Sequence, residues 1–440
     1  MSAGKDIFGD RPAQGPPQPF FHSRWVPAPA HVRDLGADVG LPAGFRAAGV
    51  ACGIKPSGRP DLGLLVCDAE TPVSAARFAD TGTPAAPVLL SQERCRLDSL
   101  RVVLANSGCA NAATGKRGLE DAAKTQGAAA IAVGVEETAV ALASTGGISH
   151  RLPVDAVLRG IIAAQQQLRR EGDADLQQAI QTTDAFEKRA CLEVELPSGP
   201  VRLTAQCKGA GMISPRFATM FCFVQTDAAM EPATADLLLG VTVKRSFDRV
   251  SVDGQLSTND TAILMCSGAS SVRIAPESED ELRFGEALDA LLRQLAIMMV
   301  ADGEGAARIA RVLVRGGDLE GAEAAARAVA NSPLVKAALH SGDPNWGRII
   351  QAVGAVIRSP PSPDGHTAPL AVDIALEGIP VCSAGAAISY DEGELAEALK
   401  AKEVEYEITL GERGGIQAET EVFFSDLSHE YVTINADYST

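Results

Sequence analysis

The sequence contains few aromatic residues and no cluster of basic residues. Only 4% of its 440 residues are Phe, Trp or Tyr, so a core has to be built from Ala, Val, Leu and Ile. The 39 Lys and Arg residues are outnumbered by 56 Asp and Glu residues, which gives a net charge of −17. Binding to nucleic acid or to an anionic membrane surface needs clustered Lys and Arg. We therefore expect neither nucleic acid nor a membrane as a partner.

Long apolar runs and paired cysteines are also lacking. Nowhere does the chain contain the roughly 18 consecutive apolar residues that would span a membrane, and its start does not resemble a signal peptide. The nine cysteines are scattered singly, without a C-x-x-C pair, and the six histidines form no H-E-x-x-H motif. These absences argue against a disulfide framework and against a zinc site. We expect a cytoplasmic protein with free thiols and no bound metal.

Predicted helices and strands alternate along most of the chain. The start is rich in Pro and polar residues, which predicts an extended N-terminal arm over residues 1–40. Apolar runs predict strands at 61–68, 100–106, 138–145 and 219–228, and the alternating end of the chain, 421–440, predicts another. Apolar periodicity predicts helices at 118–132, 153–170, 231–246, 281–300, 319–332 and from residue 346. This mixture indicates an α/β or α+β fold.

The segment KGAGMISPRFAT, residues 208–219, leads into one of the predicted strands. A Thr at the start of a buried strand is ordinarily only a good strand former. It becomes a nucleophile when the chain is cut just before it, because the new α-amine, with a pKa of about 8, can take the hydroxyl proton. The small Ala218 leaves room for the Thr219 hydroxyl to attack the preceding carbonyl. Self-cleavage between Ala218 and Thr219 is therefore one hypothesis for this segment.

Nine motifs together resemble the ornithine acetyltransferase family, the glutamate N-acetyltransferases of arginine biosynthesis. They run in family order from about residue 42 to residue 440: GFRAAGVACGIKPSGRPDLGLLVCD, VVLANSGCANAATG, LASTGGIS, IQTTDAF, KGAGMISPRFATM, DGQLSTND, ADGEGAARI, DPNWGRI and INADYST. The resemblance implies an α/β fold layered as a helix–sheet–sheet–helix sandwich, with a smaller C-terminal α/β part. It also implies self-cleavage into an alpha chain, residues 41–218, and a beta chain, residues 219–440.

The resemblance assigns roles to individual residues. Thr219 matches the nucleophile, and Thr145 and Gly146 match the pair that forms the oxyanion hole. The residues that match substrate-binding positions are Thr182, Lys208, Thr219, Glu304, Asn435 and Thr440. Taken singly, most of them have an ordinary structural explanation, such as a surface lysine or a frayed chain end. We interpret Asn106, Asn111 and residues 257–260 as scaffolding around the site.

The activity that the resemblance implies is a ping-pong transfer of acetyl from N2-acetyl-L-ornithine to L-glutamate through an acetyl-Thr219 intermediate. No metal or organic cofactor is expected, and acetyl-CoA is an optional second acetyl donor. The expected assembly is a dimer of alpha/beta heterodimers. Two alternatives stay open: a self-processing amidohydrolase or aminopeptidase, in which water resolves the acyl-enzyme, and a non-enzymatic amino-acid-binding protein that is never cut.

Overall fold

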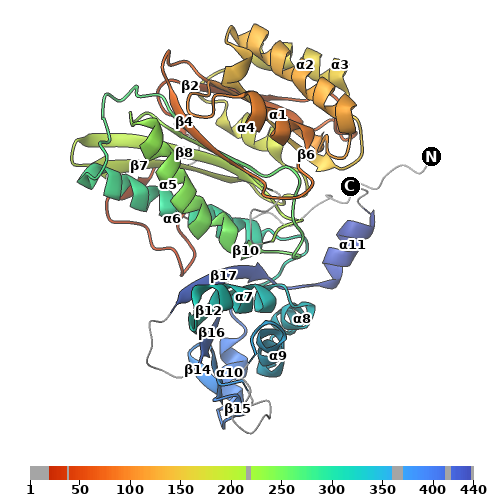
Figure 1. Cartoon of the computed structure of the whole chain (residues 1–440), viewed down its shortest axis with the longest axis vertical. Coiled ribbons are helices and arrows are strands. Elements are labelled where there is room, and N and C mark those ends of the chain that lie inside the picture. The colour runs from red at the N-terminus through yellow and green to blue at the C-terminus, as the bar shows by residue number, and fades with distance from the viewer. Residues whose placement is uncertain (1–18, 37–38, 215–219, 359–369, 412–417, 438–440) are drawn as a thin grey trace.

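The computed structural model describes residues 19–36, 39–214, 220–358, 370–411 and 418–437 (Figure 1). Three residues with predicted roles, Ala218, Thr219 and Thr440, lie outside these described residues. The fold is built on three sheets of four, six and seven strands, with helices between and around them.

The four-stranded sheet lies in the N-terminal part of the chain. Its strands, in spatial order, are β2 (Phe45–Val50), β3 (Leu62–Cys67), β5 (Val102–Cys109) and β6 (Val140–Gly147). Three helices cover its outer face: α1 (Ala86–Arg94), α2 (Gly115–Val133) and α3 (Val154–Gln166). The helix α2 is rich in Ala, and its small residues Ala122, Ala129 and Ala130 pack into the apolar core beneath it.

The six-stranded sheet contains the strand that follows the predicted cleavage point. Its strands, in spatial order, are β1 (Val32–Asp34), β7 (Lys188–Leu196), β8 (Gly199–Lys208), β9 (Phe221–Thr226), β11 (Thr261–Cys266) and β4 (Val73–Phe78). All six residues of β9 are buried, because this strand lies in the interior of the sheet between β8 and β11. Two helices, α5 (Pro232–Arg245) and α6 (Glu279–Ala301), cover the outer face.

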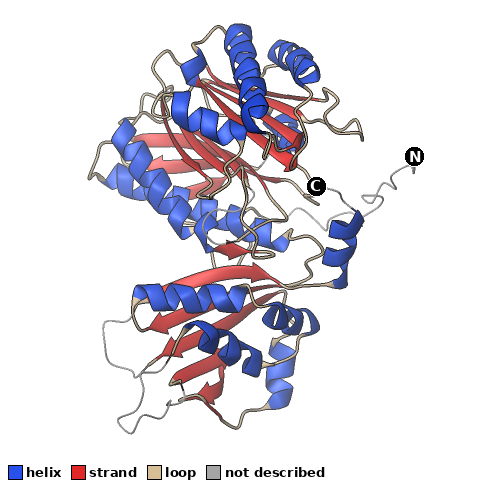
Figure 2. Cartoon of the chain, turned by 45° about the vertical axis from the view of Figure 1, so that its right-hand side comes forward, coloured by secondary structure: helices blue, strands red, loops and turns tan. Residues whose placement is uncertain are grey.

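The inner faces of these two sheets pack against each other. Their shared core contains Phe45 and Val103 from the first sheet and Phe223 and Ile263 from the second. The short helix α4 (Asp173–Ile180) adds Leu176 and Ile180 to the same core. The layers therefore run helix, sheet, sheet, helix, as the resemblance implies (Figure 2).

A separate core forms in the C-terminal part. Its sheet consists, in spatial order, of β10 (Val250–Ser251), β17 (Glu419–Ser425), β12 (Ile309–Gly316), β16 (Glu403–Leu410), β13 (Val372–Leu376), β14 (Ile379–Ser383) and β15 (Ala386–Ala387). Its helices are α7 (Leu319–Ala330), α8 (Pro333–Ser341), α9 (Trp346–Val356) and α10 (Glu392–Ala398). Because β10 lies in the connection between α5 and β11, the two parts of the fold share one sheet edge.

The described part of the predicted arm packs onto the six-stranded sheet and α6. Phe20, Trp25 and Val26 are buried in the core beneath α6. The strand β1 pairs antiparallel with β7. Residues 19–36 are thus part of the folded body.

The prediction of a strand over the end of the chain, 421–440, is wrong in its second half. The strand β17 ends at Ser425, and a helix, α11 (His429–Asp437), follows. The Ser428 hydroxyl accepts a hydrogen bond from the Tyr431 N–H, the arrangement that starts a helix. This helix carries Tyr431 and Asn435 to the site described next.

Candidate active site

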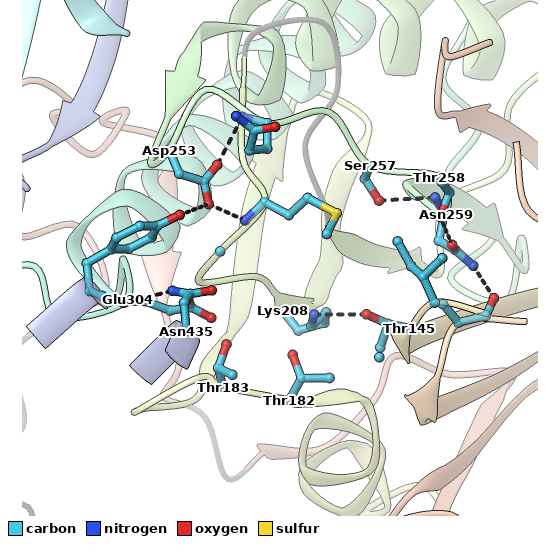
Figure 3. Close-up of a pocket in the computed structure, with 17 residues that line it drawn as sticks. Thr145, Thr182, Thr183, Lys208, Asp253, Ser257, Thr258, Asn259, Glu304 and Asn435 are labelled. Atoms are coloured by element: carbon cyan, nitrogen blue, oxygen red, sulfur yellow. Dashed lines mark hydrogen bonds between the residues drawn. The ribbon is translucent and has the colours of Figure 1, made fainter. Parts of the chain in front are cut away.

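Residues from distant parts of the chain surround one pocket of about 140 Å³ (Figure 3). It is lined by Ala110, Thr145, Gly146, Ile148, Thr182, Thr183, Lys208, Gly211, Met212, Asp253, Gln255, Ser257, Thr258, Asn259, Glu304, Tyr431 and Asn435. Six of the predicted site residues are among them: Thr145, Gly146, Thr182, Lys208, Glu304 and Asn435. The structure therefore places together every predicted site residue that it describes.

Lys208 is the buried cation of the pocket. It is the last residue of β8, and its side chain is 2% exposed. Its Nζ donates a hydrogen bond to the Thr145 Oγ1 at 3.2 Å. Burial lowers the pKa of the Lys208 ammonium, and the negative charge of Asp184 opposes that effect. Within the described part of the chain no carboxylate pairs directly with Lys208, so its ammonium can still bind an anionic ligand.

Thr145 and Gly146 lie near the end of β6, where this strand runs very close to β5. Gly146 has a φ of +125°, and a Cβ at this position would lie 2.4 Å from the carbonyl carbon of Gly108. Only glycine fits such a conformation and such a close approach. Thr145 and Gly146 thus lie side by side in the lining of the pocket.

The other side of the pocket is acidic. The Glu304 carboxylate accepts a hydrogen bond from the Asn435 amide at 2.7 Å, which joins the loop after α6 to the helix α11. A Cβ on Gly211 would lie 2.6–2.8 Å from the Glu304 carboxyl group, so a side chain there would displace this carboxylate. A ligand in this pocket would therefore meet a cation at Lys208 and an anion at Glu304 (Figure 3).

Asp253 fixes the segment that leads toward the predicted cleavage point. Its carboxylate accepts hydrogen bonds from the backbone N–H of Met212 at 2.6 Å and of Ile213 at 2.9 Å. The Tyr431 hydroxyl donates a third one at 3.4 Å. Burial raises the pKa of Tyr431, and the charges of Asp253 and Glu304 add to this effect, so the phenol stays protonated and can donate.

Asp260 anchors the residue that follows Thr219. Its Oδ1 accepts a hydrogen bond from the Met220 N–H at 3.1 Å. The carboxyl group is buried, and its Oδ2 has no hydrogen-bond partner in the described structure. Burial raises the pKa of Asp260 well above its ordinary value. Burial thus favours the neutral form of this carboxyl group, which holds the start of β9 through the Met220 N–H.

Sequence reasoning missed several of the residues that line the pocket. Asp253, Gln255, Tyr431, Gly211 and Met212 were given no role, and Ser257, Thr258 and Asn259 were interpreted as scaffolding. Asn259 does have a scaffolding contact, because its amide donates to the Ala110 carbonyl at 2.7 Å. A local signal existed only for Tyr431, which is four residues before Asn435 and therefore shares its helical face.

Among the residues that the structure describes, no group of three or more His, Cys, Asp and Glu side chains is arranged to hold a metal ion. None of the helices in those same ranges combines the length and apolar character needed to cross a membrane.

Comparisons with known proteins identify the family. The model of the ArgJ family matches residues 46–440. The arginine biosynthesis bifunctional protein ArgJ of Symbiobacterium thermophilum is 40% identical over 409 residues, which cover 92% of this chain and 99% of that protein. The protein of the same name from Rhodopirellula baltica is 42% identical over 409 residues, which cover 91% and 96%.

Among solved structures, ornithine acetyltransferase from Mycobacterium tuberculosis, complexed with ornithine, is similar to part of the chain. The two are 35% identical, with a TM-score of 0.39, over 43% of this chain and 99% of that chain. The family match, which extends over nearly the whole chain, and the full-length relatives lead to one conclusion: this protein belongs to the ArgJ family.

Proposed function

We propose that this protein is an acetyltransferase of arginine biosynthesis, which moves acetyl from N2-acetyl-L-ornithine to L-glutamate. The observation that carries the proposal is the single pocket in which Thr145, Gly146, Lys208 and Glu304 meet. Ornithine has one carboxylate and, when N2-acetylated, one ammonium at the other end. Lys208 suits the carboxylate and Glu304 suits the ammonium, so the charges of the pocket complement those of the substrate.

The proposed first half-reaction starts after the chain has been cut between Ala218 and Thr219. The free α-amine takes the proton of the Thr219 hydroxyl, and Oγ1 bonds to the acetyl carbonyl carbon. The developing oxyanion is stabilised by the Thr145 hydroxyl and the Gly146 N–H. The C–N bond to ornithine then breaks, and the proton passes from the α-ammonium to the departing amine. Ornithine leaves, and the acetyl group remains on Thr219 as an ester.

The second half-reaction reverses these steps with glutamate. Its α-carboxylate binds Lys208, and its neutral amine attacks the ester carbonyl. A new C–N bond forms, and the α-amine of Thr219 takes a proton from the attacking amine. The C–O bond to Thr219 then breaks, and the α-amine passes this proton to the departing Thr219 oxygen. No cofactor takes part in either step. The relatives are named bifunctional, and we propose acetyl-CoA as the second donor for the same acceptor.

The experiment has two stages. The intact mass of the purified protein is measured first, and two pieces that correspond to residues 1–218 and 219–440 are expected. A Thr219→Ala variant should remain a single chain, whereas Thr234→Ala, a buried threonine of α5 away from the pocket, should be cut normally. If Thr219→Ala is still cut at this position, Thr219 is not the residue that cleaves the chain.

The second stage measures ornithine release from N2-acetyl-L-ornithine with and without glutamate, and glutamate acetylation with acetyl-CoA. Release that depends on glutamate supports the transferase. Equal release in its absence supports the amidohydrolase alternative, in which water takes the place of glutamate. An uncut chain that binds ornithine and releases nothing supports the non-enzymatic alternative.

A further inference from the structure

A buried cluster of three charged residues, Asp184, Lys188 and Asp302, lies behind the pocket and lines no part of it. The Lys188 Nζ donates to the Asp184 Oδ1 at 2.7 Å and to the Asp302 Oδ2 at 2.5 Å. All three side chains are at most 2% exposed. Burying such an ion pair gains little stability over an apolar core, so its presence calls for another explanation.

The cluster is bonded to the backbone of two segments that carry substrate residues. The Asp184 Oδ1 also accepts the N–H of Gly209 at 2.8 Å, the residue next to Lys208. The Asp184 Oδ2 accepts the N–H of Thr182 at 3.0 Å. One carboxylate thus holds the main chain at both Thr182 and Lys208.

Asp302 connects the third segment. Its two carboxylate oxygens accept the N–H of Ala185 at 3.1 and 3.0 Å. Asp302 lies two residues before Glu304, whose own N–H donates to the Ala210 carbonyl at 2.9 Å. The loop that carries Glu304 is therefore tied to the segments on either side of it.

We propose that Asp184, held in place by Lys188 and Asp302, is the positioning residue that sets the spacing of Thr182, Lys208 and Glu304 around the substrate. This inference rests on the proposed function, because it assigns substrate binding to those three residues. Asp184 touches no substrate. It acts by fixing the backbone on which the binding groups are mounted and by placing a negative charge near the Lys208 ammonium.

The negative charge of Asp184 should affect the pH dependence of activity, which a residue with a purely structural role would leave unchanged. Among the described residues, the charged and titratable groups that act on Lys208 include Asp184, Lys188, Cys207, Glu304, Lys55 and Asp260. Asp184 exerts the largest effect of a charged neighbour on the pKa of Lys208, and it opposes the lowering caused by burial. Without the Asp184 charge, Lys208 should lose its proton at a lower pH.

The test compares Asp184→Asn with the unmodified protein. Asparagine keeps the shape of the side chain but removes the charge. We expect normal self-cleavage, a KM for N2-acetyl-L-ornithine raised roughly 10-fold, and a high-pH limb of kcat/KM moved down by about one pH unit. Substrate titration is the same in both proteins and cancels in the comparison. An unchanged KM and an unmoved limb in a folded variant would overturn the proposal.

Asp280→Asn is the matched control. Asp280 is also a buried aspartate that accepts a backbone N–H and a hydroxyl, both from Ser198, but it lines no part of the pocket. Its replacement should lower the unfolding temperature without moving the pH limb. If it moves the limb as far as Asp184→Asn does, the effect is one of general stability and the proposal fails.

Asp302→Asn keeps the test decisive if Asp184→Asn does not fold. It removes a charge that acts on Lys188 and on the Ala185 backbone, so KM should rise while the pH limb moves less. An unchanged KM in this variant contradicts the proposal. If the unmodified protein itself transfers no acetyl group, the proposed function fails, and that result is distinct from a failure of the positioning role.

Discussion

Two lysines are buried a short distance apart in this protein, and they differ in how far neighbouring carboxylates compensate their charges. Lys188 is completely buried, with carboxylates of Asp184 and Asp302 at 2.7 and 2.5 Å and the ring of Phe186 beneath its ammonium. Lys208 is equally buried, but its hydrogen bond in the described structure goes to the Thr145 hydroxyl. The pKa of the first is raised and that of the second is lowered.

The comparison distinguishes Lys188, whose charge stabilises the fold, from Lys208, whose charge is available to bind a ligand. For Lys188, desolvation is outweighed by the two carboxylates, so its charge is already compensated within the fold. For Lys208, desolvation is not fully compensated. A carboxylate that enters the pocket would pair with the Lys208 ammonium. This pairing would offset the free-energy cost of burying the Lys208 charge, so it would favour binding of the carboxylate. Uncompensated buried charge of this kind is typical of functional sites.

The strongest test of this contrast is Lys188→Met. It leaves two buried carboxylates without their cation, and such a loss costs about 3–5 kcal/mol of folding free energy. Denaturant unfolding should show a large drop in stability, or the protein should be recovered unfolded. A Lys188→Met variant with ordinary stability would show that Lys188 does not hold this part of the fold together.

Thr145→Ala removes the side-chain hydroxyl that contacts Lys208 and donates to the predicted oxyanion. Acetylation of Thr219 should slow roughly 100-fold, the usual cost of one oxyanion-hole donor, with little change in stability. Thr145→Ser keeps the hydroxyl and should retain most of the rate. Stopped reactions followed by mass spectrometry of the acetylated beta chain measure the step directly, and equal rates for Ala and Ser variants would remove Thr145 from the oxyanion hole.

Lys208→Met is the counterpart of the first prediction and should have the opposite result. Stability should be unchanged or higher, because a poorly compensated buried charge is replaced by an apolar side chain of similar length. Transfer efficiency should fall roughly 10- to 150-fold through the lost charge-assisted hydrogen bond. If stability falls as far as in Lys188→Met, the two lysines do not differ in the way described.

Asn435→Ala is expected to have the smallest effect. It removes one exposed hydrogen bond to Glu304, so kcat/KM should fall by about 2- to 10-fold while self-cleavage proceeds normally. Asn435→Asp should be worse, because it places a second carboxylate beside Glu304. Steady-state kinetics with N2-acetyl-L-ornithine distinguish the two. Identical activity in all three proteins would show that α11 plays no part in substrate binding.

The long regular elements could be predicted from the sequence, because their apolar patterns are strong. The helix predicted at 281–300 is observed at Glu279–Ala301, and the one predicted at 319–332 at Leu319–Ala330. The end of the chain was predicted wrongly as a strand, because its β-branched residues alternate with polar ones. Two features of this segment do indicate a helix: Ser428 is a good residue for a helix start, and Tyr431 and Ile434 are spaced three residues apart. The alternation of apolar and polar residues hides both of them.

The site residues could be named only through the family resemblance. No local pattern links Thr145, Lys208 and Glu304, which are separated by dozens of residues and meet only when two sheets and a loop pack together. Asp184 illustrates the limit most clearly. In the sequence it is one acidic residue among many. Of its three hydrogen-bonding partners, Thr182, Lys188 and Gly209, the last becomes a neighbour only in the folded chain.

The order of the six-stranded sheet bears on how the two pieces of a cut chain would be held together. The strands β9 and β11 follow residue 219, whereas their outer neighbours β8 and β4 both precede it. After a cut at Ala218–Thr219, the second piece would be an insert, bonded on both edges to strands of the first. Separation would then break two ladders at once and expose the core on both sides. The pieces should therefore resist dilution, exchange poorly between molecules and unfold together, and either piece made alone should aggregate.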